Sequence, residues 1–440
     1  MGPFHFFVRS RKIAMLHSQD NTAFLQICAA LVLFMTPGLA FFYGGLVRAS
    51  SVVSMMMMSF GSLGLIGVMW VAFGYAMSFS NAGSGHFIGW DGVFGIDLDK
   101  LFLNDVVQQS LSKDSFPLAF AAFQGTFAII TVALISGAIA DRAKFGSWMV
   151  FAGLWATLVY FPVAGWIFNF SGSFGHINDG GWLVKDVGVL DFAGGTVVEI
   201  ASGASALAVA LVVGKRFGFM KGMHAPHNVP LVLIGVGILW FGWFGFNAGS
   251  ELIADGTASL AWVNTLAAPV GAMATWGLIE KLKHGKPTSI GIGSGAIAGL
   301  VAITPACGFL TPVWSLLLGA IVGAVCFYAI EMKYVLGFDD SLDVVGIHLV
   351  GGLVGTLFIG LFGNGVGLAL GYGPAQLGRQ AIGAVVVLVY AFLGAYVLAW
   401  LVQKTIGFRV TSTDEIAGVD LVQHGETAYA GNDPRWSWRG

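Results

Sequence analysis

The chain has 440 residues, of which 56% are hydrophobic and only 10% are charged, and it contains 64 glycines. A soluble domain carries about 25% charged residues, so this composition excludes a soluble protein and indicates an integral membrane protein. The formal net charge of −2 argues against a nucleic-acid partner, because such a partner would favour a basic surface.

Apolar runs recur along the chain, and each is close to the ~20 residues that a membrane-spanning helix needs. They predict an all-α membrane protein of about eleven transmembrane helices. The runs lie at about 23–44, 52–79, 117–140, 147–170, 192–213, 229–249, 257–280, 289–304, 312–332, 344–362 and 379–403.

Three segments follow from these runs. Residues 1–22 form an N-terminal segment, 23–403 the transmembrane domain and 404–440 a polar C-terminal tail. The loops between the runs are short, so we expect no inserted soluble domain.

The distribution of basic residues predicts the orientation of the chain, because cytoplasmic loops collect Lys and Arg. Alternate loops and the tail hold most of these residues, whereas the opposite loops hold few. With an odd number of spans, this places the tail in the cytoplasm and the N-terminus outside a cell membrane, although the basic residues before position 13 oppose it. The cytoplasmic set is Arg48, Arg142, Lys144, Lys215, Arg216, Lys221, Lys281, Lys283, Lys286, Lys333, Lys404, Arg409, Arg435 and Arg439, and the opposite set is Lys100, Lys113, Lys185 and Arg379.

An odd span count also fits five helices, a second five of opposite topology, and a final helix, which is the inverted-repeat design of many transporters. The fifth run follows Asp191 and holds Glu199, while the tenth follows Asp340 and holds His348. Each predicted half therefore places one titratable side chain inside its last helix.

Glu199 lies about a third of the way into its apolar run. A carboxylate at that depth costs several kcal/mol unless it has a partner or lines a wet cavity. Asp191, Gly195 and Glu199 are spaced four apart and so follow one helical face. We expect a pore-lining helix with Asp191 at its mouth; the alternative is a Glu that only ties two helices together.

His348 is the only one of the nine histidines that lies well inside an apolar run. Together with Glu199 it would form a pair near the middle of the membrane that can accept and pass a proton. The alternative is a core histidine whose hydrogen bonds are satisfied by its neighbours.

Neither a metal centre nor a cofactor site is expected. Cys28, Cys307 and Cys326 lie in or beside apolar runs and form no metal or redox motif, so we interpret them as small packing residues. Phe123 and Phe246 also lie on Gly-rich helices, where aromatic residues are more often packing than gates. An aromatic cluster with a hydroxyl can, however, hold a small cation by cation–π attraction.

Motifs along most of the chain resemble those of the ammonium transporter (Amt/Mep/Rh) family, in family order from about residue 23 to 430. The most specific is D-F-A-G-G-T-V-V-E-I-A-S-G-A-S-A-L, which begins at Asp191. The others are P-G-L-A-F-F-Y-G-G-L-V-R (37–48), A-F-Q-G-T-F (122–127), G-W-F-G-F-N-A-G-S (242–250), S-G-A-I-A-G-L-V-A-I-T-P-A-C-G (294–308), D-D-S-L-D-V-V-G-I-H (339–348) and H-G-E-T-A-Y (424–429).

The resemblance implies a homotrimer whose subunits each contain eleven helices and a narrow pore. It assigns Phe123 and Ser250 to an outer ammonium site, and Phe123 with Phe246 to a stacked gate below it. Asp191 would shape the site without touching the substrate, and His348 matches the second of two pore histidines. The tail resembles that of bacterial members regulated by cytoplasmic PII proteins, although it could also serve only to couple the subunits.

Two positions depart from the common bacterial pattern. Glu199 replaces the first pore histidine, as in some fungal and bacterial members. Phe168 takes the position of a vestibule Trp, and its π face attracts a cation more weakly. Trp166 is two residues away and would point elsewhere on a helix.

The expected activity is ammonium transport: ammonium loses its proton at the mouth, ammonia crosses a hydrophobic pore, and Glu199 with His348 relays the proton. One alternative is an ammonium sensor that signals through its tail and transports little. Another is an ion-coupled solute transporter, which would need a more polar cavity than these Phe- and Gly-rich helices provide.

Overall fold

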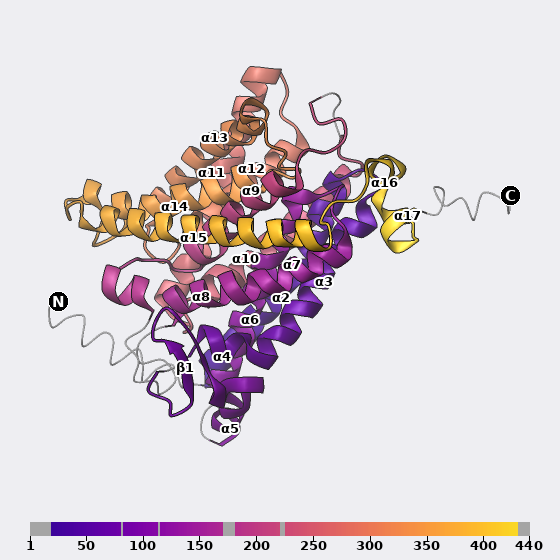
Figure 1. Cartoon of the computed structure of the whole chain (residues 1–440). Coiled ribbons are helices and arrows are strands. Elements are labelled where there is room, and N and C mark those ends of the chain that lie inside the picture. Colours follow the sequence, from indigo (N-terminus) through magenta and orange to yellow (C-terminus); the bar gives the residue numbers. More distant parts are fainter. Residues whose placement is uncertain (1–18, 81, 113–114, 170–180, 221–224, 430–440) are drawn as a thin grey trace.

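The structure is a computed structural model that describes residues 19–80, 82–112, 115–169, 181–220 and 225–429 (Figure 1). Most of the predicted N-terminal segment, 1–22, lies outside the described residues, as does the end of the tail from residue 430. Lys113 and Lys221, which contributed to the predicted orientation, lie outside them too.

The described chain is almost entirely helical, so the prediction of an all-α membrane protein is confirmed. Within the described residues, nine helical stretches are long and apolar enough to cross a membrane. They are α2 (Gln19–Leu46), α3 to α4 (Val52–Ser78), α6 with η3 (Phe116–Ile139), α7 to α8 (Phe145–Phe168), η7 with α9 (Gly195–Val213), α10 (Val229–Gly249), α13 (Pro312–Leu336), η8 with α14 (Val345–Phe362) and α15 (Ala375–Thr405).

Two more helices coincide with the remaining predicted runs: α11 (Gly256–His284) and α12 (Ser289–Ile303). Their starts follow from side-chain caps. Asp255 accepts a hydrogen bond from the backbone N–H of Thr257 at 2.8 Å, and Thr288 accepts one from Gly291 at 2.9 Å. Every predicted apolar run therefore corresponds to a helix.

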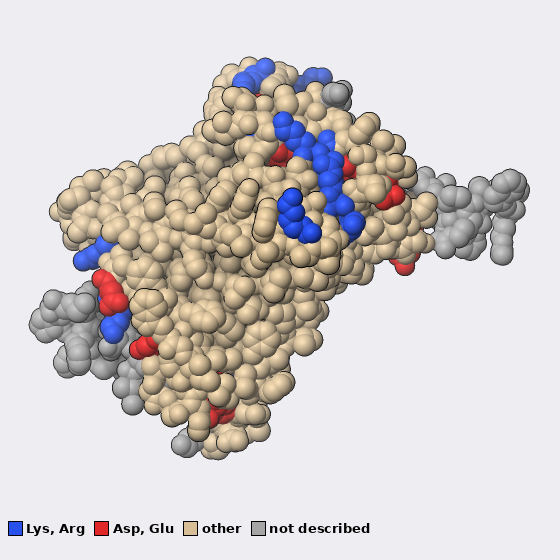
Figure 2. Space-filling model, viewed as in Figure 1, with Lys and Arg blue, Asp and Glu red and all other residues tan. Residues whose placement is uncertain are grey.

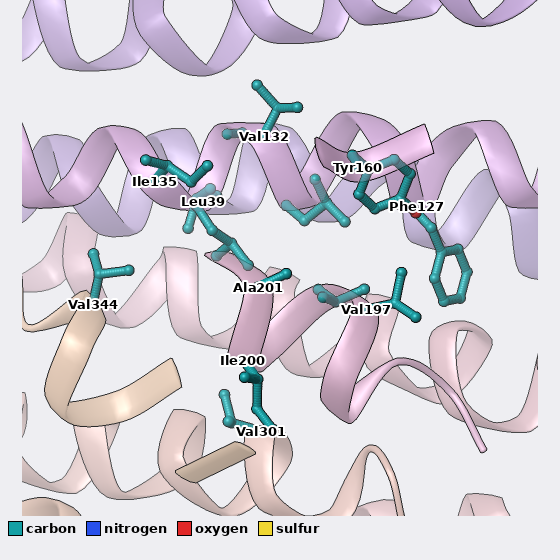
Figure 3. Packing of buried hydrophobic residues seen from close by; sticks show 14 of the residues in the cluster. Leu39, Phe127, Val132, Ile135, Tyr160, Val197, Ile200, Ala201, Val301 and Val344 are labelled. Atoms are coloured by element: carbon teal, nitrogen blue, oxygen red, sulfur yellow. The ribbon is translucent and has the colours of Figure 1, made fainter. Parts of the chain in front are cut away.

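The helices pack side by side into one bundle (Figure 1). In it, α10 packs along α2, α11 lies against α12 and α13, and α15 lies against α9. Figure 3 shows the interior, where Ile200 of η7 points towards Val301 of α12, and Phe127 belongs to α6 on the other side of the η7–α9 segment. All three side chains are buried.

Several helices contain π-helical turns, which the sequence analysis did not predict. Those within the membrane-spanning stretches are η1 (Trp70–Gly74), η4 (Ala156–Tyr160), η7 (Gly195–Ile200) and η8 (Val345–Leu349), and η6 (Leu183–Val187) lies between two of them. Such turns are frequent at functional sites. The turns η7 and η8 contain Glu199 and His348, respectively.

The segment between α4 and α6, expected to be a simple loop, folds into a small unit. Strands β1 (Phe87–Trp90) and β2 (Phe94–Asp97) pair antiparallel, followed by η2 (Leu98–Leu103) and α5 (Asn104–Ser112). Lys100 is buried here, 3.5 Å from Asp97, and it donates a hydrogen bond to the carbonyl of Phe79. Burial lowers the pKa of Lys100 to about 8.

The C-terminal tail contains two short helices, α16 (Ser412–Ala417) and α17 (Val419–His424), that dock on the bundle. The Asp420 carboxylate accepts hydrogen bonds from Val53 and Ser54, at 3.0 and 2.7 Å, and so caps the start of α3. Glu415 accepts hydrogen bonds from the N–H of Phe217 at 2.6 Å and from Arg409 at 2.7 Å. Carboxylates at helix N-termini are stabilising, so these contacts hold the tail against the bundle.

Charge is distributed unevenly over the surface. On the face shown in Figure 2, Lys and Arg side chains gather towards the end of the molecule where α16 lies, whereas the flank formed by α15 and α8 is almost free of charge. An uncharged band of this kind suits contact with lipid hydrocarbon.

Candidate functional site

The structure brings the two buried titratable groups together. Nδ1 of His348 lies 2.6 Å from Oε2 of Glu199, within hydrogen-bond distance. The relative exposure of Glu199 is 0% and that of His348 is 4%. The second carboxylate oxygen, Oε1, is buried and has no hydrogen-bond partner among the described residues. A carboxylate and an imidazole joined in this way can exchange a proton between them.

Two glycines allow the helices that contain this pair to approach each other closely. Gly203 follows Glu199 by one helical turn, and a Cβ on it would lie 2.3 Å from the backbone nitrogen of Leu349. Gly352 follows His348 by the same interval, and a Cβ on it would lie 2.8 Å from Cβ of Glu199. The contact is reciprocal, because each glycine packs against the other half of the pair.

The pair lines a narrow cavity inside the bundle. Apart from Glu199 and His348, its lining side chains are aliphatic, aromatic or Met. They are Met35, Leu39, Phe42, Ile130, Leu134, Val198, Leu239, Trp243, Phe246 and Ile297. A narrow apolar cavity disfavours any charged species, because the ion must shed its water to enter.

Phe246, which lines this cavity, stacks on Phe127, with ring centroids 4.1 Å apart and an interplanar angle of 16°. The predicted stack of Phe123 on Phe246 is therefore wrong. Phe123 lies one turn before Phe127 on α6, and its ring meets that of Phe127 edge-on at 4.8 Å. Both residues belong to the A-F-Q-G-T-F motif, and positions four apart share a helical face, so the sequence pattern alone did not distinguish them.

The residues predicted for the outer site surround these rings. Phe123 is buried against Gly249, the neighbour of Ser250 in the chain. The Ser250 hydroxyl donates a hydrogen bond to the Phe246 carbonyl at 2.8 Å. Phe168 is buried as well, and its ring lies edge-on to Phe127 at 5.9 Å.

Trp166 points away from this cluster, as its spacing from Phe168 predicts. Its indole N–H donates to the carbonyl of Val93, between β1 and β2, at 2.6 Å, and its ring packs on that of Tyr390 at 4.7 Å. It therefore connects α8 to the hairpin and to α15.

Asp191 caps the helix that contains Glu199. Its carboxylate accepts hydrogen bonds from the backbone N–H groups of Gly194, Gly195 and Thr196, at 2.7–2.8 Å, and from the Thr196 hydroxyl at 2.5 Å. Gly194 adopts φ +114°, a conformation open to glycine but strained for other residues. The D-F-A-G-G-T sequence thus folds into a turn whose N–H groups converge on one carboxylate.

Asp340 occupies the matching place before His348. Its Oδ2 accepts a hydrogen bond from the N–H of Val345 at 2.7 Å, while Oδ1 is buried with no hydrogen-bond partner among the described residues. Lys333 donates to the Asp340 carbonyl at 3.0 Å and pairs with Asp343 at 2.5 Å. Burial raises the pKa of the Asp340 carboxyl to about 6.

The fully buried guanidinium of Arg142 connects several helix ends near Asp340. Arg142 donates to the Gly214 carbonyl at 2.7 Å, to the Asp339 carbonyl at 2.6 Å and to the Ser341 hydroxyl at 2.6 Å. Burial lowers the pKa of Arg142 to about 10. The sequence analysis used Arg142 only as a marker of loop charge, but its contacts connect the ends of η3 and α9 to the segment before η8.

Metal binding finds no support in the part of the chain that the structure describes. That part contains no group of three or more His, Cys, Asp or Glu side chains placed to hold a metal ion. Cys28, Cys307 and Cys326 are free and buried.

Comparison with known proteins places the chain among transporters. The model of the Ammonium Transporter Family matches residues 23–429. The chain is 47% identical over 430 residues to an ammonium transporter of Mycobacterium bovis, a match covering 93% of this chain and 90% of that protein.

Solved structures agree in fold. The crystal structure of Candida albicans Mep2 is 32% identical, with a TM-score of 0.81, and the match covers 96% of this chain and 93% of that chain. A structure named Sensor Amt Protein is 27% identical with a TM-score of 0.83, and the match covers 94% of this chain and 100% of that chain. The family match and the identity to curated relatives both extend over nearly the whole chain, and the chain therefore belongs to the ammonium transporter family.

Proposed function

We propose that this protein moves ammonium across the membrane as ammonia plus a separately relayed proton. The observation that carries the proposal is the 2.6 Å contact between Glu199 and His348 inside a cavity whose other walls are apolar. Family membership supports ammonium as the substrate, and the buried pair supports the manner of transport.

Selection against potassium follows from the chemistry of the two ions. Ammonium has a proton that can be removed and potassium has none. A dry pore penalises both cations, but ammonium can leave its proton at the mouth and cross as neutral ammonia. The stacking of Phe127 on Phe246, a residue of the cavity wall, supports this scheme, because the stacked rings leave little room for a hydrated ion.

Glu199 is the proton acceptor in this scheme, and His348 is its partner. Oε2 faces the imidazole, and Oε1 has no other partner within the described chain. Each ammonium would then deliver one ammonia and one proton, which moves one net charge per transport cycle.

Recruitment of ammonium is assigned to Phe123, Phe168 and Ser250, and the gate to Phe127 and Phe246. Phe123 and Phe168 both meet Phe127 edge-on, so the recruiting and gating rings form one continuous cluster. Asp191 shapes the mouth and does not touch the substrate, since its oxygens are occupied by N–H and hydroxyl donors.

For the membrane topology we propose about eleven spans, the nine apolar stretches plus α11 and α12. An inverted five-plus-five repeat with α15 as the final helix is supported by the match between the two pore segments. In both, an Asp caps a π-helical turn, the titratable residue follows eight positions later, and a glycine follows that residue by four.

The proposed domains are an N-terminal extracytoplasmic segment at 1–22, the transmembrane domain at 23–403 and a cytoplasmic tail at 404–440. The protein would lie in the cell (inner) membrane with its N-terminus outside. The concentration of Lys and Arg towards the end of the molecule near α16 supports this orientation (Figure 2).

The assembly we propose is a homotrimer in which each subunit has its own pore. Exposed apolar side chains on the bundle are available for such contacts or for lipid, as on α2 and α10. A cytoplasmic PII protein is the proposed regulatory partner. Glu415 and Asp420 dock the tail on the bundle, and Asp420 contacts the start of α3. A partner that binds the tail could therefore act on α3 through Asp420.

An ammonium sensor is the second candidate. The likeness to the structure named Sensor Amt Protein favours it, and so does a tail attached to the start of α3, because movement of that tail could transmit a signal. A sensor would bind ammonium while passing little current.

The test is a current measurement on the purified full chain, reconstituted in liposomes on a solid-supported membrane. We expect ammonium to evoke a saturable inward positive charge displacement and potassium at equal concentration to evoke none. Equal responses to the two cations would overturn the selection mechanism, and ammonium binding without current or uptake would favour the sensor.

A further inference from the structure

Trp243 contributes its ring to the wall of the pore cavity while its polar atom is bonded elsewhere. It lies on α10, its ring centroid is 5.7 Å from that of Phe246, and it lines the cavity with Glu199 and His348. Its Nε1 donates a hydrogen bond to Oγ1 of Thr304 at 2.7 Å. Trp243 and Thr304 are both buried, with exposures of 3% and 0%.

The direction of this hydrogen bond is fixed by its two ends. The indole N–H can only donate. The Thr304 hydroxyl has a single proton, which it donates to the Leu300 carbonyl at 2.8 Å, so towards the indole its oxygen acts as an acceptor. The single hydrogen-bond donor of the Trp243 side chain is therefore used by Thr304, the residue that directly follows α12.

This arrangement keeps a hydrogen-bond donor out of the pore. Among the residues that line the cavity, only Glu199, His348 and Trp243 have polar side-chain atoms, and that of Trp243 is bonded to Thr304. An indole N–H released from Thr304 would need a new acceptor, because an unpaired buried donor is unfavourable. Water drawn into the cavity would supply one.

We infer that Thr304 is a positioning residue for ion selectivity, whose hydroxyl holds the Trp243 indole N–H away from the pore and so keeps the pore dry. The inference rests on the proposed function in one respect, namely that the cavity is the path of ammonia. Selectivity would then depend on a residue outside the cavity as well as on the gating rings.

A neighbouring interaction provides a matched control. Asn247, also on α10, donates to Oγ1 of Thr265 at 2.9 Å, and that hydroxyl donates to the Ala261 carbonyl at 2.7 Å. In both cases a buried donor on α10 bonds to a threonine hydroxyl of another segment, α11 for Asn247 and the end of α12 for Trp243. Asn247, however, is not part of the cavity lining.

The experiment compares Thr304→Val with Thr304→Ser and Thr265→Val in the full chain, reconstituted in liposomes. The readouts are potassium-evoked current and osmotic water permeability, neither of which requires ammonium. We expect Thr304→Val to raise the potassium-evoked signal at least about tenfold above the wild-type background, a factor equivalent to one hydrogen bond. Thr304→Ser keeps the hydroxyl and should exclude potassium as the wild type does, and so should Thr265→Val.

A double variant shows whether the indole N–H is the group involved. In a Trp243→Phe background there is no N–H to hold, so adding Thr304→Val should leave the potassium current unchanged. Potassium exclusion retained in Thr304→Val would overturn the inference, and so would an equal leak in Thr265→Val. If Thr304→Val does not fold, Thr304→Ser still tests the inference. This variant keeps the hydroxyl, so a potassium leak through it would overturn the inference.

Failure of the inference and failure of the proposed function are distinguishable. The ammonium current of the wild type tests the function, whereas the potassium and water leaks of the variants test the role of Thr304. A wild type without ammonium current but with a leak specific to Thr304→Val would retain the inference and reject the function.

Discussion

The segment before Glu199 and the segment before His348 have the same design but different electrostatics. Asp191 lies eight residues before Glu199, and Asp340 lies eight residues before His348. Both carboxylates accept a hydrogen bond from the backbone N–H five residues later, at 2.7 Å. Asp191 has three further hydrogen bonds, whereas Asp340 has a second oxygen with no hydrogen-bond partner within the described chain.

The difference shows that equivalent positions need not have equivalent roles. A carboxylate that accepts four hydrogen bonds, as Asp191 does, is a fixed support for its turn. A buried carboxylate with one unsatisfied oxygen pays a desolvation cost, and that cost is why the pKa of Asp340 is raised. We therefore expect Asp191 to be structural and Asp340 to respond to pH.

The largest expected effect is on stability. Asp191→Ala leaves the N–H groups of Gly194, Gly195 and Thr196 without their acceptor, at about 1–3 kcal/mol each, or on the order of 5 kcal/mol in total. Asp340→Ala removes the acceptor of only one, Val345, and should cost about 1–3 kcal/mol at most when both variants are compared with the wild type near pH 4, where Asp340 is protonated. Thermal unfolding in detergent measures both, and equal losses would contradict the comparison.

The second effect is the pH dependence of stability. The folded-state pKa of Asp340 is about 6 against an ordinary value of 3.8, so the folded protein binds its proton more readily than the unfolded chain. The resulting destabilisation is absent below about pH 4, grows between pH 4 and 6 and is complete above, where it reaches about 3 kcal/mol. Asp340→Asn removes it.

The measurement for this prediction is the unfolding midpoint of the wild type and of Asp340→Asn between pH 4 and 7. The midpoint of the wild type should fall relative to that of the variant as pH rises through this range. Parallel curves would show that Asp340 does not titrate there.

A third effect concerns the two glycines that pack across the pair. Gly203→Ala places a methyl against the backbone of Leu349, which cannot yield, and should cost about 2–3 kcal/mol. Gly352→Ala meets the side chain of Glu199, which can shift, and should cost about 1 kcal/mol while reducing ammonium current. Unfolding midpoints and currents of both variants test this, and the reverse order of stability would contradict it.

The smallest effect is expected at the tail. Asp420 caps α3 much as Asp191 caps η7, but with two backbone donors, so Asp420→Asn should cost about 1 kcal/mol. Hydrogen exchange of 412–424 should rise in the variant while that of the pore helices stays the same. Unchanged exchange at the tail would show that Asp420 does not hold it.

Much of the fold could be predicted from the sequence. Every predicted apolar run coincides with a helix, because hydropathy specifies which segments enter a bilayer. The pairing of Glu199 with His348 followed from their depth in two such runs and from their matching place in the two halves.

Other features depend on contacts between segments far apart in the chain. The π-helical turns, the hairpin at 87–97 and the burial of Lys100 arise from packing that no local pattern encodes. The ring that stacks on Phe246 was missed because Phe123 and Phe127 share one helical face. The Trp243–Thr304 hydrogen bond was missed because Thr304 ends an apolar run that gives no sign of its partner.

The central claim is that Glu199 relays protons, and Glu199→Gln tests it most directly. Glutamine keeps the size and can still hydrogen-bond His348, but it cannot titrate. Ammonium-evoked current and ammonia uptake should be measured together across pH on the reconstituted protein. The account predicts that the current is lost while ammonia still crosses, and currents like those of the wild type at every pH would contradict it.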